Sequence, residues 1–531
     1  MTRSPWATVA AAALASGVLF APPASSQDGT DQQFGTVHFA TSCNETAQRR
    51  FDRAMRYQHS FWYRESKALF EEVLKADPEC TIAYWGIALS LLFNPHSSTP
   101  AVNLAPGLAA LEKGKLFGAK TQRERDYIDA LFVLYADYDK LTYGQRVQKY
   151  LTAMEALAQR YPDDDEAQIA YAITLNVAAS PNDKTYAYQL KGAAILEPIF
   201  KRQPRHPGVA HYLIHLYDYP TIAEKGLDAA RRYAEIAPAA PHAQHMPSHI
   251  FTRVGYWNES ISSNLASVRA AKAGKEWNDE LHAMDYLVYA YLQLGRDKEA
   301  RAVVDEMIET KSFNPSVRSG PYGIAAGEAR YTIERRDWKS AAALQVRSSK
   351  FFEADALTYF ARALGAAHVG DLEGAAADIA QLAALREKLR QAKDAYWTEQ
   401  VDIQWQIASA WLLYAKGQHE QALAVMRDAA DAEDKTEKHV VTPGQLKPAR
   451  ELYGDMLLDR GMAKEALVAF EATLAKEPRR LGATLGAAKA AEKASDAAKA
   501  RQYYAAGVEL TEHADPIRPE IAAARAFVAT R

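Results

Sequence analysis

Apolar and polar residues alternate along most of this chain in the pattern of amphipathic helices. Alanine, leucine, glutamate, lysine and arginine are abundant, whereas long β-branched runs bounded by turn residues are missing, so strands have little from which to form. Four of the helical segments end in proline, which cannot continue a helix: FEEVLKADP, MEALAQRYP, AARRYAEIAP and FEATLAKEP. The pattern predicts an all-α fold.

Glycine corners divide the helical segments into hairpins. A small residue follows each corner glycine five positions later, which lets the two helices of a hairpin pack closely. These pairs are Gly255 and Ser260, Gly295 and Ala300, Gly370 and Ala375, Gly417 and Ala422, and Gly461 and Ala466.

The period of these hairpins is near 34 residues, and in this the chain resembles the tetratricopeptide repeat (TPR) family. The resemblance implies a TPR-like α-solenoid, a right-handed superhelix in which the first helix of each hairpin lines a concave groove. We expect the array to span residues 44–515, after a lead-in at 27–43 and before a C-terminal tail at 516–531. Turn-rich stretches interrupt it at 94–107, 310–323 and 434–444.

The first 26 residues have the character of a secretory signal peptide. Arg3 precedes an apolar stretch from Ala7 to Phe20, and small residues lead up to Gln27. No other segment is long and apolar enough to span a bilayer. We therefore expect a periplasmic or secreted protein. Cys43 and Cys80 would form a disulfide in such a compartment, or else remain two buried free thiols.

Charge excludes one class of partner. The formal net charge is -3, and lysine and arginine are scattered along the chain. A stripe of basic residues that could neutralise phosphates is missing, so we expect no nucleic-acid partner.

Histidines gather in one part of the predicted array. The corner glycines Gly255 and Gly295 allow the two hairpins to be aligned. Thirteen residues before these glycines lie His242 and His282, ten residues before lie His245 and Asp285, and six residues before lie His249 and Tyr289. Aligning Gly226 with the small residues of the next two hairpins places His211 and His215 on the same stripe. In the TPR family this stripe faces the groove where ligands bind.

The spacing of these histidines suits a transition metal. His211 and His215 are four residues apart, as are His245 and His249, so each pair lies on one helical face. Imidazoles from neighbouring helices, with His242 and either His282 or Asp285, would suit zinc, copper or nickel better than magnesium or calcium. Pro247 would break the second helix, so the sequence does not fix the position of His242 and His245 relative to His249. Two alternatives remain: the histidines only line the groove or hydrogen-bond between helices, or their protonation makes the groove sensitive to pH.

Catalysis by such a site would need a base. The zincin motif is absent, because Tyr212 and Met246 stand where that motif has glutamate. Asp285, Glu451 and Asp455 are the available acids, the last two on a later repeat that could face the histidines across the superhelix.

Several blocks also look like a wider set of exported bacterial TPR proteins for which we know no assigned activity: HFATSC, DPECTIAYWGIALS, HPGVAHYLIHLYD, APHAQHMPSHIFTRVGYWNESI and TPGQLKPARELYGDML. We expect a solenoid that binds a peptide, protein segment or small ligand in its groove, with Tyr289, Arg330 and His282 as ligand-binding residues. The alternatives are a metal-dependent hydrolytic or oxidative enzyme, and a scaffold without a site.

Overall fold

The computed structural model describes residues 32–530, and all regular structure in this part of the chain is helical. The predicted signal peptide lies outside the described residues. No helix in the described part is long and apolar enough to cross a membrane.

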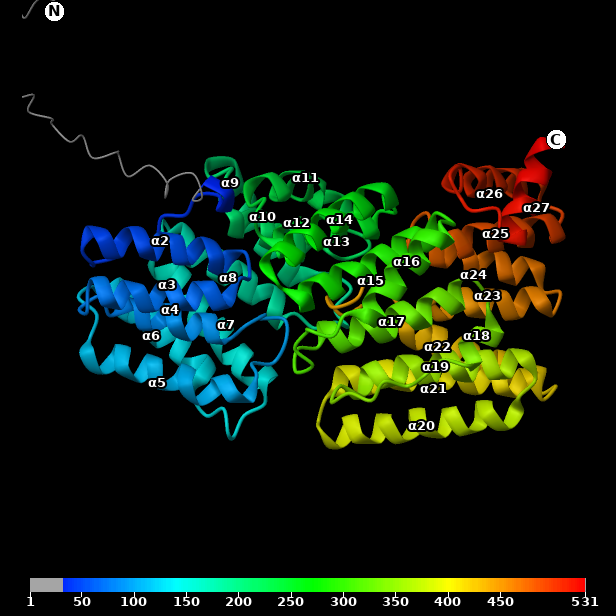
Figure 1. Ribbon diagram of the computed structural model, residues 1–531, viewed down its shortest axis with the longest axis horizontal. Coiled ribbons are helices and arrows are strands. Elements are labelled where there is room, and N and C mark those ends of the chain that lie inside the picture. The colour runs from blue at the N-terminus through cyan, green and yellow to red at the C-terminus, as the bar shows by residue number, and fades with distance from the viewer. Residues whose placement is uncertain (1–31, 531) are drawn as a thin grey trace, which may run out of the picture.

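The N-terminal helices pack as antiparallel neighbours and form the blue and cyan end of the molecule (Figure 1). Their bounds are η1 (Gln32–Phe34), α2 (Glu45–His59), α3 (Tyr63–Ala76), α4 (Ile82–Leu91), α5 (Ala101–Phe117), α6 (Gln122–Tyr135), α7 (Tyr143–Arg160), α8 (Asp165–Ala178) and α9 (Ala187–Arg202). Side-chain caps fix several starts. The capping boxes of α6 and α7, for example, pair Thr121 with Glu124 and Thr142 with Gln145.

The middle of the chain, green in Figure 1, carries the predicted histidine stripe. Its helices are α10 (Pro207–Tyr217), η2 (Ala223–Gly226), α11 (Leu227–Ile236), α12 (Pro241–His245), α13 (Pro247–Arg253), α14 (Trp257–Gly274), α15 (Trp277–Gln293), α16 (Asp297–Glu309), α17 (Ser319–Glu334) and α18 (Trp338–Ala342). A new helix begins at Pro247, because proline is tolerated in the first turn of a helix but not in its interior.

The C-terminal helices continue the same hairpin packing. They are α19 (Phe352–Val369), α20 (Leu372–Gln391), α21 (Ala395–Ala415), α22 (His419–Glu433), α23 (Ala449–Asp459), α24 (Ala463–Lys476), α25 (Leu481–Lys493), α26 (Ala497–Leu510) and α27 (Pro519–Ala529). The last helix lies in the predicted tail and packs against α26.

The corners follow the sequence pattern. All five corner glycines have positive φ, from 67° at Gly295 to 83° at Gly370, a backbone conformation that glycine adopts without steric cost. The small residue five positions later is fully buried in each hairpin. These features make the fold a TPR-like α-solenoid, as predicted. Cys43 and Cys80 form a disulfide that ties the start of α2 to the start of α4.

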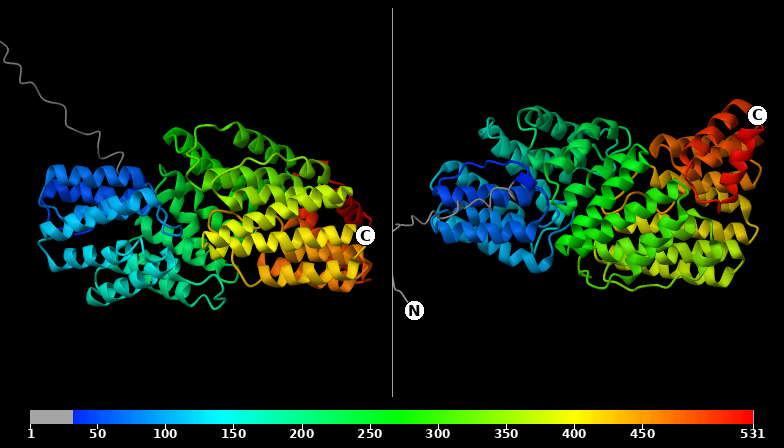
Figure 2. Two further views of the ribbon diagram at one scale, coloured as in Figure 1. Left: turned by 90° about the horizontal axis from the view of Figure 1, so that it is seen from below. Right: turned by 45° about the horizontal axis from the view of Figure 1, so that its top comes forward.

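The solenoid bends back on itself, so that its orange and red C-terminal helices lie beside green ones (Figure 2). Trp257 Nε1 donates to the Arg479 carbonyl at 2.9 Å, and Gln293 Oε1 accepts from the Leu481 amide at 2.9 Å. Near the C-terminus, Arg518 forms a buried ion pair with Asp297. Contacts between distant repeats therefore supplement the nearest-neighbour packing that is usual in a solenoid.

Residues 434–448, which we name the inner segment, connect α22 to α23 and run through the concave side. They are visible as an orange loop beside green α15 (Figure 1). Residues 441–449 are buried apart from Gln445, which is half-buried. Arg330 of α17 donates to the Gln445 and Gly444 carbonyls at 2.6 and 3.2 Å. The inner segment therefore packs against α15 and α17 through Tyr286 and Arg330.

Candidate metal centre

Six histidines from four helices in the middle of the chain come together in two buried groups. Helix α10 supplies His211 and His215, α12 supplies His242 and His245, α13 supplies His249, and α15 supplies His282. His242 and His245, three residues apart on α12, belong to different groups, whereas His245 and His249, on either side of the break at Pro247, belong to the same group. Each group is a triad whose ligand atoms lie within 4.8 Å of one another.

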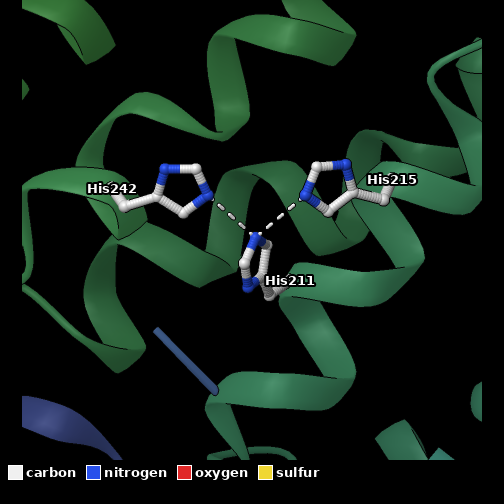
Figure 3. Close-up of side chains that lie close together, drawn as sticks. All are labelled: His211, His215 and His242. Carbon is white, nitrogen blue, oxygen red and sulfur yellow. Dashed lines mark hydrogen bonds between the residues drawn. The ribbon is translucent and has the colours of Figure 1, made fainter. Parts of the chain in front are cut away.

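The first triad consists of His211, His215 and His242 (Figure 3). The Nε2 atom of His211 lies 3.1 Å from Nε2 of His215 and 3.1 Å from Nε2 of His242. Nδ1 of His211 donates to the backbone carbonyl of His59 at 2.7 Å, because a carbonyl can only accept. Nε2 of His211 therefore carries a lone pair, and one lone pair cannot satisfy two imidazole donors at once.

The second triad consists of His245, His249 and His282. Nδ1 of His245 lies 2.7 Å from Oδ1 of Asn264, whose orientation is set because its Nδ2 donates to the Ser260 carbonyl. Nδ1 of His249 donates to the Asp218 carboxylate at 2.8 Å. Both Nδ1 atoms carry the ring hydrogen, so both Nε2 atoms bear lone pairs.

These two bare Nε2 atoms are 3.1 Å apart. Two lone pairs at this distance repel, and the Tyr286 hydroxyl nearby donates its hydrogen to the Thr442 carbonyl. A metal ion resolves the conflict: two nitrogens each about 2.0–2.1 Å from zinc at a tetrahedral angle are about 3.3 Å apart. The residues present fit such an ion, and their Nδ1 partners are of the kind that orient metal-binding imidazoles.

The two triads are neighbours. The ring centroids of His215 and His249 are 6.0 Å apart, and those of His242 and His245 are 6.2 Å apart. His96, from the loop before α5, stacks on His215 at 4.4 Å, and its Nε2 is buried without a hydrogen bond among the described residues. Sequence reasoning missed His96 because it stands alone in a polar turn, far from the other histidines in the chain.

Burial keeps these imidazoles neutral, the form that binds a metal. It lowers the pKa of His211 and of His282 to about 3, and the pKa values of His215, His242 and His245 well below the usual range. Neighbouring imidazoles add to the effect, because a second positive charge in the cluster would be repelled.

Asp218 joins the second triad to the inner segment. Its Oδ2 accepts from His249 and, at 2.9 Å, from the buried Lys438, while its Oδ1 accepts from Arg253 at 2.8 Å. Burial alone would raise the pKa of Asp218, but Lys438 and Arg253 hold it well below the usual range. Burial also lowers the pKa of Lys438 to about 8. The ionised carboxylate therefore remains a firm acceptor for His249.

A third group with ligand spacing, His59, Glu166 and His206, is satisfied without a metal. Nδ1 of His206 accepts from the Val209 amide, so its Nε2 donates to Glu166 at 2.9 Å. His59 contacts Glu166 at 3.1 Å through one nitrogen and the Tyr212 hydroxyl at 3.1 Å through the other. This group is a hydrogen-bonded bridge between α2, α8 and α10.

The remaining predicted site residues lie outside both triads. Asp285 faces Arg330 at 3.4 Å, and burial raises the pKa of Asp285 to about 6. Arg330, predicted to bind a ligand, binds the inner segment. The Tyr289 hydroxyl donates to Glu477 at 2.9 Å and accepts from Arg480 at 2.8 Å.

The two acids of the later repeat pair with basic side chains rather than with histidines. Glu451 is buried against Arg480 and Lys447, and Asp455 contacts Lys447 at 3.0 Å and Arg336 at 2.7 Å. No described contact of either carboxylate involves a triad, so the geometry gives neither acid a role there as a base.

Comparison with known proteins adds little to this geometry. No family model and no curated protein matches the chain. Among solved structures, the human IFIT1 dimer is 10% identical over 81% of this chain and 90% of its own, with a TM-score of 0.34. Yeast Tom70 is 12% identical over 91% and 88%, with a TM-score of 0.29. The TPR domain of P58(IPK) is 16% identical over 69% and 99%, with a TM-score of 0.21. Such scores carry no functional argument, so the fold assignment rests on this chain's own hairpins.

Proposed function

We propose that this protein is an exported TPR-like solenoid that holds two transition-metal ions in a six-histidine centre. The observation that carries the proposal is the pair of bare Nε2 atoms of His245 and His249, 3.1 Å apart with both Nδ1 hydrogens committed elsewhere. In the first triad, the lone pair on Nε2 of His211 faces two imidazole nitrogens at 3.1 Å, and this also supports a bound cation. Two triads of three imidazoles support two ions rather than one.

An all-imidazole ligand set favours zinc, copper or nickel. Each triad supplies three protein ligands, which is the number found at catalytic zinc sites that keep one position for water or substrate, whereas structural sites use four. This supports a reactive centre, and metal-dependent catalysis is the second candidate function. A metal in either triad would act as a Lewis acid or would activate a bound water.

The groove itself supports a small ligand rather than a linear peptide beside the centre. The inner segment already occupies the concave side next to α15 and α17, where it accepts hydrogen bonds from Tyr286 and Arg330. Binding of a peptide or protein partner would use other surfaces of the solenoid.

Export is supported by the predicted signal peptide and by the Cys43–Cys80 disulfide, because disulfides persist in oxidising compartments. We therefore propose a periplasmic or secreted location, where the metal would be taken up outside the cytoplasm.

Elemental analysis of the untagged mature protein tests the metal centre. We expect about two ions per chain, and about one in each of His211→Ala and His249→Ala, because each variant disables a single triad. His513→Ala, which changes an exposed histidine of the C-terminal region, is the matched control and should retain both ions. A wild-type protein that neither contains nor takes up zinc, copper or nickel would refute the proposal.

A further inference from the structure

A cavity of about 80 Å³ lies inside the N-terminal half of the solenoid, beside the first triad. Helices α2, α4, α6, α7, α8 and α10 contribute to its wall, which is mostly aromatic and aliphatic. Among the lining residues are Phe61, Tyr63, Phe93, Ala170 and Ile173. An apolar cavity of this kind stays dry and gains dispersion contacts when a small apolar molecule enters.

A series of ring contacts leads from the surface to the metal ligands. Phe93 is 41% exposed and lines the cavity. Its ring centroid lies 5.5 Å from that of Tyr63, which lies 5.2 Å from that of Phe61. The Phe61 ring in turn lies 4.3 Å from His211. The lining of the cavity therefore includes a partly exposed residue, Phe93, and a residue in contact with the first triad, Phe61.

Phe61 forms the partition between cavity and triad. Its ring stacks on His242 with centroids 5.1 Å apart, in addition to its contact with His211. The residue has φ of 56° and stands at the corner between α2 and α3, where five other hairpins of the chain have glycine in the same left-handed conformation. A bulky side chain costs about 1–2 kcal/mol in that conformation.

The size and chemistry of the cavity limit its occupant. A cavity of about 150 Å³ accommodates benzene, so one about half that size takes a molecule smaller than benzene, such as a diatomic gas or a single xenon atom. The lining offers few polar groups. One of them, the hydroxyl of buried Tyr63, makes no hydrogen bond among the described residues. An occupant would be uncharged and apolar and would accept at most one weak hydrogen bond.

We propose that this cavity is the binding site and entry path for a small apolar molecule of the dioxygen class, with Phe61 as the gate to His211 and His242. The inference deepens the proposed function, because it supplies the metal centre with its ligand, and in that sense it rests on it. It stands on the cavity and on the ring contacts of Phe61 with His211 and His242, which are independent of whether a metal is bound.

Xenon is the probe, because it binds apolar cavities without hydrogen bonds and can be located in pressurised crystals or by ¹²⁹Xe NMR. In the metal-free full-length protein we expect one xenon atom in the cavity. Ala170→Leu fills the space and should reduce xenon binding at least about tenfold. If that variant does not fold, Ile173→Phe fills the same cavity from the same helix.

Phe61→Ala tests the gate, and we expect a second xenon position beside His211 and His242. Phe132→Ala removes a ring that lies outside the cavity and should leave xenon binding unchanged. A wild-type cavity that remains empty, or Ala170→Leu protein that binds xenon as well as wild type, would overturn the site. A Phe61→Ala protein without the second position would overturn the gate. Because xenon is tested without metal, these failures are distinct from a failure to find metal in the protein.

Discussion

A hydrogen on one ring nitrogen decides what the other nitrogen of a histidine can do. In the second triad, Asn264 and Asp218 each hold an Nδ1 hydrogen, and this turns two lone pairs toward each other. The distance alone would fit a hydrogen bond. The proposal of a cation rests on the positions of the hydrogens. The bridge of His59, Glu166 and His206 has the same spacing, but each of its ring hydrogens has an acceptor.

Asn264→Ala should weaken metal binding at the second triad by about 10- to 100-fold, because His245 would lose the partner that orients it. A competition titration with a chromophoric chelator would measure the two affinities. Asn258→Ala, an exposed change on the same helix, should alter neither. Equal affinities in the Asn264 and Asn258 variants would show that the Nδ1 partner does not orient the ligand.

At the scale of helices, the packing of α18, α19 and α21 contains a partly buried imidazole away from the candidate metal centre. His368 stacks on Trp338 with centroids 4.0 Å apart, and its ring contacts that of Trp411 at 4.2 Å in a tilted arrangement. Burial lowers the pKa of His368 to about 4, whereas the unfolded chain has the ordinary value near 6.5. Lys447 lowers this pKa further, and Asp455 opposes the shift.

Between these two pKa values the unfolded chain binds more protons, so acid destabilises the packing of these helices. Above about pH 6.5 the protonation of His368 does not change the free energy of unfolding. That free energy falls as the pH drops toward 4. At pH 5 the loss reaches up to about 2 kcal/mol relative to pH 8. Urea unfolding of the wild type and of His368→Phe at both pH values measures it. The difference between the two proteins should change by that amount, and a difference independent of pH would contradict the assignment.

At the scale of the whole molecule, the inner segment joins repeats that lie far apart in sequence. Lys438 reaches Asp218 beside the second triad, and Tyr396 of α21 donates to the Glu437 carbonyl at 2.8 Å. Arg330 fixes the far end of the segment through two carbonyls. The segment therefore couples the metal centre to the C-terminal repeats.

Arg330→Lys should loosen this segment while keeping a positive charge beside Asp285. An ammonium group cannot reproduce the planar set of guanidinium hydrogen bonds. We expect amide hydrogen exchange in residues 439–446 to accelerate about tenfold or more, measured by mass spectrometry. Arg347→Lys, which affects a half-exposed ion pair with Glu328, is the control. Unchanged protection in the Arg330 variant would mean that other contacts hold the segment.

The sequence predicted the repeats well because their signals are local. Corner glycines and the small residues that follow them are set by the backbone and by close packing within one hairpin, and the structure has both features at all five corners. The sequence left open whether Cys43 and Cys80 form a disulfide or remain free thiols, and the structure has the disulfide.

The candidate site was only partly predictable. The stripe identified the six triad histidines, but not their division into two groups, which separates His242 from His245 within α12 and depends on contacts with α10 and α15. Asp285 lay on the same stripe and yet faces Arg330. Four further residues contact the triad histidines from other parts of the fold: Asp218, Asn264, His96 and Phe61. A single sequence gives no signal for such long-range contacts.

The position of the inner segment in the chain has a consequence for the order of assembly. Residues 211–282 precede residues 434–448 in the chain, so during export they would emerge first and could pack on their neighbours before the inner segment follows, since a solenoid propagates from repeat to repeat. Until then the inner segment would not be in place beside the second triad. Afterwards Lys438 and Thr442 cover the second triad. Metal loading is therefore easiest in a partly folded chain, and a finished molecule would exchange its ions only as fast as the segment opens.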